Sequence, residues 1–544
     1  MKQYIIILIT LGFGTGLFAQ NDPLGGQDKI VLENERIEDV INSEKPPMKV
    51  PYQEIGEDDI PKLNYQSQDI KVETDFEPDP PSPAAYQPDP LPEVKNNYAK
   101  AGFGRYTTPL LDVYLYSGRD QDYDYGLEFS HLSAHSDKVE RREFNNNRLG
   151  ITGSYGLNEQ TKVSGQLEVL NRSYWNYGDT VMRANLFDTT KMGFTQVSLG
   201  ANLFRPYEEG NQLDYNLGAN IEFHQDKRTN RELHISLIPE VSFAINDELD
   251  LGFESKFTVT GAKIAGFGQS RLYGALKPYI RYSSGAVQVV AGLRGSMYNN
   301  NADLQGQSLF VPEGELRARI LPQELTVFLG HTGGIKYNRY SDLIRTNPYL
   351  SSIVEIQPTL EKTNLYAGVS GQIPNLLDYN ARVSYRRVGN ALIHMVPVDG
   401  AYFMLGYDSL MTDLGLHLEV NHDLLKTVKI GAALDVHNYT TSTVADNFHA
   451  PPLQLTGYGE YSQNKLTART EVNFFGSTPM TVNNENIVEN RPVYVDLNLG
   501  ADYKLTEQFS VWAEVNNLLN SNYQRWWNYT ERPFDVKAGI TLGF

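Results

Sequence analysis

Histidine pairs, nucleophile motifs and phosphate-binding loops are the usual signs of catalysis in a sequence, and this chain of 544 residues holds almost none of them. It contains no H-E-x-x-H, G-x-S-x-G, P-loop or G-x-G-x-x-G motif. His131 and His135 are four residues apart, which on a strand separates them by about 13 Å along its axis. A Ser–His–acid site spread over several strands would leave no linear motif. We expect a protein that is not an enzyme, with no cofactor and no metal site.

Charged side chains recur at alternate positions of several segments near the end of the chain. Because alternate residues of a strand share one face, these charges would line a common polar surface. Two interpretations stay open for that surface: a solvated interior held by ion pairs, or the lining of a channel. The residues concerned are Arg469, Glu471, Asp496, Asp502, Glu514 and Lys537.

Aromatic side chains cluster in two segments that we expect to be loops. Such residues can stack on sugars or contact a partner protein. They can equally form the band of aromatic residues at a membrane interface, and the sequence favours neither interpretation. The residues concerned are Trp175, Tyr177, Trp526, Trp527 and Tyr529.

Strands must position all of these residues, because apolar and polar residues alternate in segment after segment from about residue 96. The opposite faces carry charges, and the strands are too many for one sandwich. A strand-built membrane span has to close into a barrel. We therefore predict an all-β, transmembrane antiparallel barrel of about 22 strands. Their approximate centres are residues 102, 114, 128, 151, 166, 198, 218, 238, 256, 276, 291, 314, 330, 368, 384, 416, 432, 456, 470, 498, 513 and 539.

Short and long connections alternate along this series of strands. Short turns on one rim and long loops on the other are typical of outer-membrane barrels. An even number of strands places both ends of the chain on the short-turn side, which is periplasmic in that class. Two of the long connections, 338–362 and 390–408, are candidates for folding inward.

The first 95 residues differ from the rest in composition. Residues 1–19 have the plan of a secretory signal peptide. Residues 20–95 hold 12 of the 27 prolines, with 18 acidic and 7 basic residues, and predict an extended periplasmic segment. The barrel then spans residues 96–544. The chain has no cysteine, and its net charge of −19 argues against binding nucleic acid.

The chain ends in a strand that alternates up to its last residue. This end resembles the C-terminal signal of outer-membrane proteins, which implies recognition by the barrel-assembly machinery and contact with outer-membrane lipid. Its apolar column is Phe534, Val536, Ala538, Ile540, Leu542 and Phe544.

The last 34 residues also resemble the final hairpin of TonB-dependent receptors, and the Tyr-rich strands look like those of Bacteroidota proteins. The matching residues are Asn517, Leu518, Tyr523, Arg532 and Gly539. The resemblance implies a 22-stranded barrel and a plug domain before it, yet residues 20–95 show no plug pattern. The candidate for a TonB box is Ile30, Val31 and Leu32.

Two functions follow from these predictions. The first is transport of an unidentified solute across the outer membrane. The second is a sealed barrel that serves as a structural or assembly subunit and docks periplasmic or outer-membrane protein partners through residues 20–95.

Overall fold

The computed structural model describes residues 97–544, apart from ten short segments within that range: 118–122, 136–141, 159, 179–190, 206–211, 302, 352–353, 375, 397–401 and 483–486. The predicted signal peptide, the segment 20–95 and the TonB-box candidate Ile30–Leu32 lie outside the described residues. The division of the chain into these parts therefore stays a prediction.

Twenty-two antiparallel strands form one sheet, which confirms the predicted fold class. Every predicted strand centre falls within one of them. The strands are β1 (Tyr98–Gly104), β2 (Thr108–Tyr116), β3 (Tyr123–Ala134), β4 (Phe144–Asn158), β5 (Thr161–Trp175), β6 (Lys191–Phe204), β7 (Leu213–Asp226), β8 (Arg231–Ala244), β9 (Leu249–Ile264), β10 (Phe267–Ser284), β11 (Val287–Asn300), β12 (Asp303–Leu321), β13 (Leu325–Lys336), β14 (Thr359–Ile373), β15 (Leu377–Met395), β16 (Met404–Leu425), β17 (Val428–Thr440), β18 (Leu453–Gln463), β19 (Leu466–Phe475), β22 (Tyr494–Lys504), β23 (Phe509–Asn516) and β26 (Asp535–Gly543).

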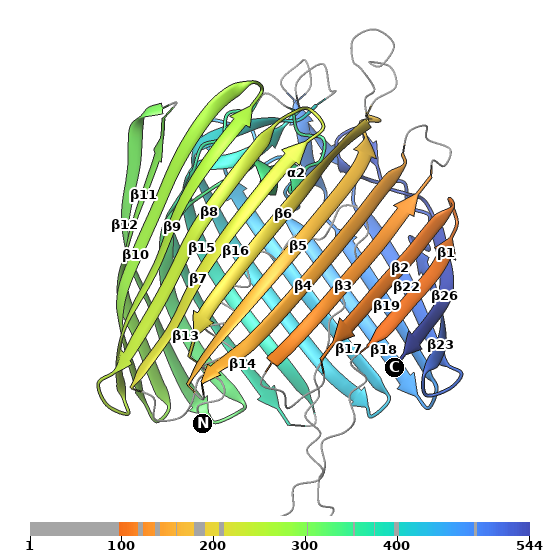
Figure 1. The fold of residues 1–544 in the computed structure, drawn as a ribbon, viewed down its shortest axis with the longest axis horizontal. Helices are drawn as coiled ribbons and strands as arrows, with labels where there is room; N and C mark the ends of the chain where they lie inside the picture. The colour runs from red at the N-terminus through yellow and green to blue at the C-terminus, as the bar shows by residue number, and fades with distance from the viewer. Residues whose placement is uncertain are drawn as a thin grey trace, which may run out of the picture. The chain divides into compact units, whose positions relative to one another are not determined.

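The sheet closes on itself through its first and last strands (Figure 1). Each strand pairs with its neighbours in order, and β1 pairs with both β2 and β26. Gly102 lies opposite Gly539 in the closing register. Closure leaves no strand edge without hydrogen-bonding partners, as a span through lipid requires.

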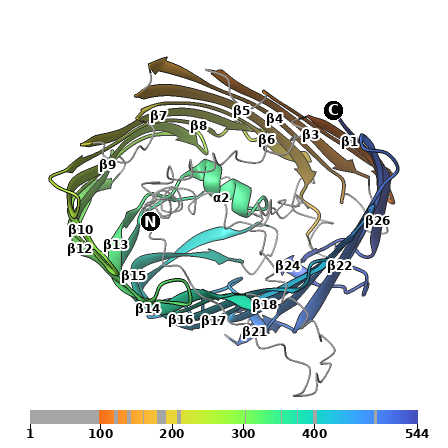
Figure 2. The same ribbon diagram turned by 90° about the horizontal axis from the view of Figure 1, so that it is seen from below.

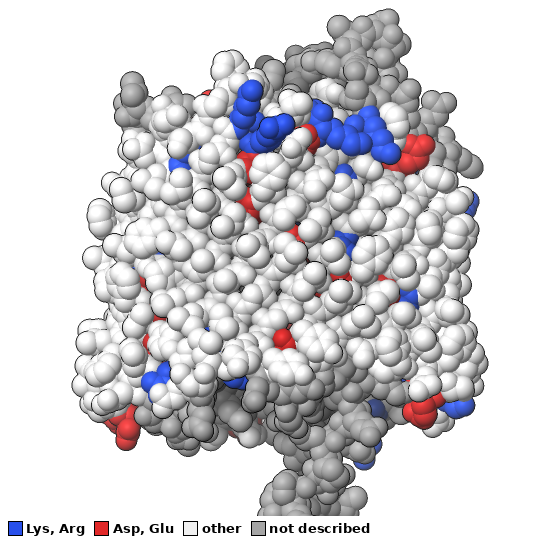
Figure 3. Space-filling model, viewed as in Figure 1, with Lys and Arg blue, Asp and Glu red and all other residues white. Residues whose placement is uncertain are grey.

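Period-2 alternation gives the barrel an apolar outside and a polar inside. On β8, the outward side chains of Leu233, Ile235 and Leu237 are 43%, 43% and 54% exposed, whereas His234 and Ser236 between them are buried. A soluble protein would bury the first group and expose the second. The face of the barrel drawn in Figure 3 accordingly shows few charges between the two rims.

The two rims of the barrel differ. At one, which we call the turn rim, strands are joined by tight turns such as 285–286, and Phe544 N donates to Asn97 O (3.0 Å) beside the barrel's first strand. The opposite rim, which we call the loop rim, carries the longest connections. These contain α2 (Tyr340–Thr346) and two small hairpins, β20 (Thr478–Val482) with β21 (Val488–Arg491) and β24 (Gln524–Trp526) with β25 (Tyr529–Thr530).

The expected loop 390–408 is shorter than predicted, because β15 and β16 continue to pair beyond it. Ala391 lies opposite Asp408 and Met395 opposite Met404, so only 396–403 connects the two strands. Among the described residues no helix has the length and apolar character needed to cross a membrane.

Candidate functional site

The connection between β13 and β14 turns into the barrel instead of projecting outward. We call residues 337–358 the luminal segment. Its helix α2 lies inside the ring of strands when the barrel is viewed along its axis (Figure 2). Tyr340, Ser341, Leu343 and Ile344 of this helix are buried. The prediction that this loop folds inward is confirmed.

A buried ion pair of the barrel wall holds the start of α2. Glu232 on β8 pairs with Arg271 on β10, and their side chains are 1% and 0% exposed. The Glu232 carboxylate also accepts the main-chain N–H groups of Tyr340 (3.3 Å) and Ser341 (3.0 Å). Arg271 donates in turn to Asn338 O (3.1 Å). The Glu232 carboxylate thus neutralises a buried cation and accepts hydrogen bonds from two N–H groups that have no partner within the helix.

A second set of polar contacts surrounds Arg339. Its guanidinium pairs with Asp342 (2.6 Å) and with Glu222 of β7 (3.0 Å). Ser341 Oγ donates to the same Glu222 carboxylate (3.0 Å). Burial alone would raise the pKa of Asp342, but the Arg339 charge and its hydrogen bonds outweigh burial and hold that pKa below its ordinary value. Asp342 is therefore ionised at neutral pH, and the pair is charged on both sides.

The Tyr340 hydroxyl makes the third anchor. It donates to Asp226 Oδ2 (2.6 Å) and accepts from Asn230 Nδ2 (2.8 Å). Burial, followed by Asp226, raises the pKa of Tyr340 well above its usual range, although Arg228 opposes this. The hydroxyl therefore stays protonated and remains a donor.

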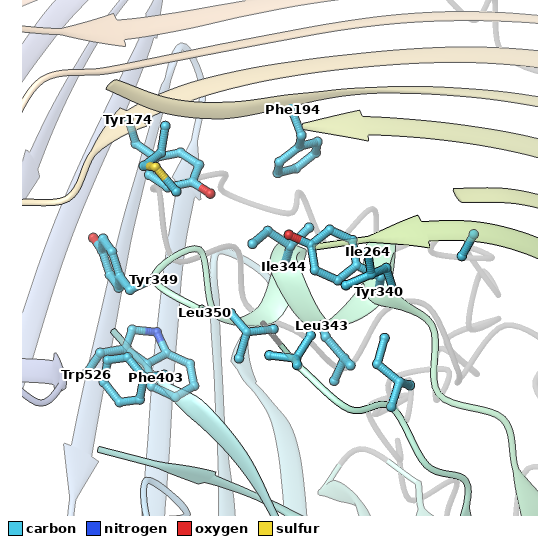
Figure 4. Close-up of a cluster of buried hydrophobic side chains, with 14 of the residues drawn as sticks. Tyr174, Phe194, Ile264, Tyr340, Leu343, Ile344, Tyr349, Leu350, Phe403 and Trp526 are labelled. Atoms are coloured by element: carbon cyan, nitrogen blue, oxygen red, sulfur yellow. The ribbon is translucent and has the colours of Figure 1, made fainter. Parts of the chain in front are cut away.

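Aromatic side chains of other loops pack against the luminal segment, and Figure 4 shows Phe403 and Trp526 beside Tyr349 of that segment. Tyr349 stacks on Tyr529, with ring centroids 3.4 Å apart and an interplanar angle of 15°. Phe403 meets Trp526 edge to face at 5.3 Å. His449 lies 5.1 Å from both of these rings. This aromatic cluster is continuous with the apolar side of α2.

The aromatic residues named from the sequence lie in or near this cluster. Trp526 and Tyr529 are only 7% and 2% exposed, so neither presents its ring at the surface of the loops. Tyr177 and Trp527 are partly buried against the same cluster. Trp175, at the end of β5, is of intermediate exposure. Contact of these residues with a ligand or partner stays untested.

Most of the inward charges named from the sequence lie in ion pairs. Arg469 pairs with Glu460 (3.0 Å) and Asp502 (2.6 Å). Glu514 pairs with Lys100 (2.7 Å), whose ammonium also lies 4.0 Å from the centre of a Trp512 ring. Lys537 pairs with Asp535 at 3.8 Å. The other two, Glu471 and Asp496, accept hydrogen bonds from the side-chain amides of Asn473 and Asn498.

The terminal hairpin residues are brought together by local hydrogen bonds. Asn517, with φ of 49°, donates from Nδ2 to the carbonyls of Ser521 (2.9 Å) and Arg532 (3.0 Å). Tyr523 stacks on Tyr494 at 4.0 Å. Gly539 faces the main chain of β1 so closely that a Cβ there would collide with the Ala101 carbonyl.

The remaining residues named from the sequence are Leu518 and the apolar column at the end of the chain. Leu518 is 37% exposed, and Ile540, Leu542 and Phe544 are 47%, 44% and 52% exposed. The other members of the column, Phe534, Val536 and Ala538, precede them on the last strand and its approach.

The two histidines make separate contacts. His131 Nδ1 lies 2.6 Å from Asn147 Oδ1, and its Nε2 lies 3.2 Å from Ser133 Oγ. His135 instead donates its main-chain N–H to Tyr106 O (2.8 Å). Within the part of the chain that the structure describes, no three His, Asp or Glu side chains gather to hold a metal ion.

The anchors of the luminal segment were not predicted from the sequence. One signal was present: Tyr340, Leu343 and Ile344 have the i, i+3, i+4 spacing of a helix with one apolar face. The wall partners Glu222, Glu232 and Arg271 gave no such signal, because each is an ordinary inward position of its strand.

Several solved structures share the fold of this chain. No protein-family model and no curated protein matches the sequence. The FrpB iron transporter from Neisseria meningitidis aligns with a TM-score of 0.66 and 10% identity, over 83% of each chain. The ferric-catecholate import receptor Fiu from E. coli K12 aligns with a TM-score of 0.65 and 8% identity, over 83% of this chain and 82% of that chain. The ferripyoverdine receptor of the outer membrane of Pseudomonas aeruginosa aligns at 0.62 and 14%, over 82% and 71%. At such identities the likeness shows a common fold.

Proposed function

We propose that this chain is an outer-membrane transport protein related to TonB-dependent receptors, and that its lumen is obstructed at rest by its own luminal segment. The observation that carries the proposal is the set of buried wall contacts around Glu232 and Tyr340, which hold a loop inside a 22-stranded barrel. A barrel of this size encloses a lumen that side chains of the wall alone do not fill.

The proteins with the same fold support transport as the class of function. They are an iron transporter, a ferric-catecholate import receptor and a ferripyoverdine receptor of the outer membrane. The solute of the present chain is unidentified. A transporter needs a part that can be displaced, and the luminal segment suits this role because it is anchored by polar contacts that water can replace.

The membrane orientation belongs to the same proposal. The turn rim, with both barrel ends, would face the periplasm, and residues 20–95 would follow the signal peptide as an extended periplasmic segment without a plug fold. Residues 534–544 would be read by the barrel-assembly machinery, and Ile30–Leu32 is the candidate for contact with TonB. The Tyr-rich strands favour an origin in the Bacteroidota. The proposal includes no catalytic role and no nucleic-acid partner.

Planar-bilayer conductance tests the proposal on three forms of the protein: the full chain, a form without residues 20–95, and a form in which 340–350 is replaced by a short Gly/Ser linker. We expect the full chain to be nearly silent and the linker form to show steady conductance. If the form without residues 20–95 conducts, that segment also obstructs the lumen. Silence of the linker form would contradict transport through the lumen.

The alternative is a sealed barrel that acts as a structural or assembly subunit. Complete burial of the anchor favours it, since Arg271 and Tyr340 are 1% and 0% exposed. In this case residues 20–95 would dock a periplasmic partner. Co-purification of a defined partner with the full chain, and its loss without residues 20–95, would support the alternative.

A further inference from the structure

Four cations lie together on the outer surface of the loop rim. Lys191 begins β6, Lys227 follows β7, Arg231 begins β8 and Lys263 lies one residue before the end of β9. All four are exposed. Figure 3 shows Lys and Arg side chains gathered near this rim, above a surface with few charges.

The strand register brings the four residues side by side. Arg231 and Lys263 are direct partners in the β8–β9 ladder. Lys227 N donates to Gly193 O (2.9 Å), two residues from Lys191. Although Lys227 is exposed, partial removal of its amine from water, and then the Lys191 charge, lower its pKa, and the second of these causes places the two ammonium groups near each other. The four residues therefore form one patch across β6–β9, which we call the rim cations.

No carboxylate of the described residues forms an ion pair with any of the rim cations, although the barrel interior pairs most of its charges. Arg228, between Lys227 and Arg231, points inward and donates to Leu350 O (2.8 Å). Like charges placed directly opposite each other in a ladder are destabilising. An external anion at Arg231 and Lys263 would remove that cost.

The surface directly below the rim cations is apolar. Leu199, Phe223, Leu233 and Val259 continue the outward faces of the same four strands and are 52%, 40%, 43% and 51% exposed. Leu233 lies only two residues, or about 7 Å, below Arg231 along the strand. The cations thus sit at the upper edge of the lipid-facing surface, at the depth of lipid headgroups.

We propose that the rim cations and the apolar surface beneath them bind a phosphorylated lipid of the leaflet at the loop rim. The rim cations would pair with the phosphate groups, and the apolar strand faces would contact the acyl chains. A single amphipathic molecule with an anionic headgroup satisfies both parts of the surface. The inference rests on the membrane placement proposed above and does not depend on transport.

Native mass spectrometry of the detergent-solubilised full chain tests the site, with three probes: lipid A carrying its phosphates, the same lipid after removal of the phosphates, and inorganic phosphate. We compare the wild type with a variant that combines Lys191→Gln, Lys227→Gln, Arg231→Gln and Lys263→Gln. Each surface cation contributes about fivefold to binding of an anionic lipid. The variant should therefore bind phosphorylated lipid A at least about a hundredfold more weakly, and the dephosphorylated lipid unchanged.

The matched control changes three exposed lysines at the turn rim, Lys426→Gln, Lys465→Gln and Lys504→Gln, and should retain binding. Equal binding by the wild type and the rim variant would overturn the proposal. So would an equal loss in the control, or displacement of the lipid by inorganic phosphate at similar concentration. Heat-modifiable electrophoresis checks that each barrel is folded. Should the combined variant not fold, Lys263→Gln alone should lose about fivefold.

This result and the conductance result are separable. A silent linker form with intact lipid binding would contradict transport alone. A conducting linker form without phosphate-dependent binding would contradict the lipid site alone.

Discussion

Replacing Glu232 by alanine should release the luminal segment while leaving the barrel intact. The Glu232 side chain holds Arg271 and the first two N–H groups of α2. Its main chain remains in the ladder between β7 and β9. The variant therefore removes the contact between wall and segment without removing a strand hydrogen bond.

The size of the effect follows from the burial of the pair. Because the Glu232 and Arg271 side chains are 1% and 0% exposed, the variant leaves an uncompensated charge away from water. Removal of one partner of a buried pair costs about 3–5 kcal/mol. The variant bears this cost in its closed form. Opening of the segment would let water reach Arg271 and remove most of the cost, so the equilibrium shifts toward the open form. The opening equilibrium should shift by about two to three and a half orders of magnitude.

Hydrogen exchange, followed by mass spectrometry on peptides that cover 337–351, measures this shift. The amides of Leu343 and Asn347, which bond to Arg339 O (3.1 Å) and Leu343 O (2.9 Å), report on the helix. Their exchange should accelerate at least about a hundredfold in Glu232→Ala. Adding Arg271→Met should reverse most of the change, because no buried charge is then left alone.

Glu460→Ala is the matched control, since it breaks a pair whose side chains are 34% and 53% exposed. Such a pair contributes under about 1 kcal/mol, so exchange of 337–351 should not change. Unchanged exchange in Glu232→Ala would show that the segment is held by contacts other than this anchor.

Three further predictions concern the loops and the barrel closure. Tyr349→Ala removes the stack on Tyr529 and should weaken the aromatic cluster by about 3–5 kcal/mol, measured as faster proteolysis of 337–358. Gly539→Val should abolish the heat-modifiable folded band in electrophoresis, because its side chain would collide with the main chain of β1, whereas Gly500→Ala has room and should fold. Burial lowers the pKa of His449 from 6.5 to about 3, so closure of its loop is complete above pH 6.5 and weakens as pH falls toward 3. Exchange of 441–452, corrected for intrinsic rates, should rise by up to about tenfold per pH unit in the wild type and stay level in His449→Gln.

The barrel could be predicted from the sequence because each strand carries its own signal. Outward positions such as Leu233 and Ile235 must be apolar wherever the strand lies in the ring. Alternation of period 2 therefore reveals the strand without knowledge of its neighbours. The ends of β15 and β16 were missed, since beyond the lipid-facing part the pairing Ala391–Asp408 continues without an apolar pattern.

The contents of the lumen could not be predicted in the same way. Glu232 and Tyr340 are 108 residues apart, and their contact depends on which wall the loop meets after folding. The same holds for Tyr529, a predicted loop residue, which stacks on Tyr349 of the luminal segment. Local patterns report the environment of a strand face, whereas contacts across the lumen depend on the closed barrel.

Single-channel conductance of Glu232→Ala, measured beside Glu460→Ala, tests the claim that the luminal segment obstructs a passage through the barrel. We expect Glu232→Ala to raise the open probability by about two orders of magnitude over the nearly silent wild type, and Glu460→Ala to stay silent. A Glu232→Ala barrel that remains silent, although hydrogen exchange shows its segment to be released, would contradict the claim and favour the sealed structural subunit.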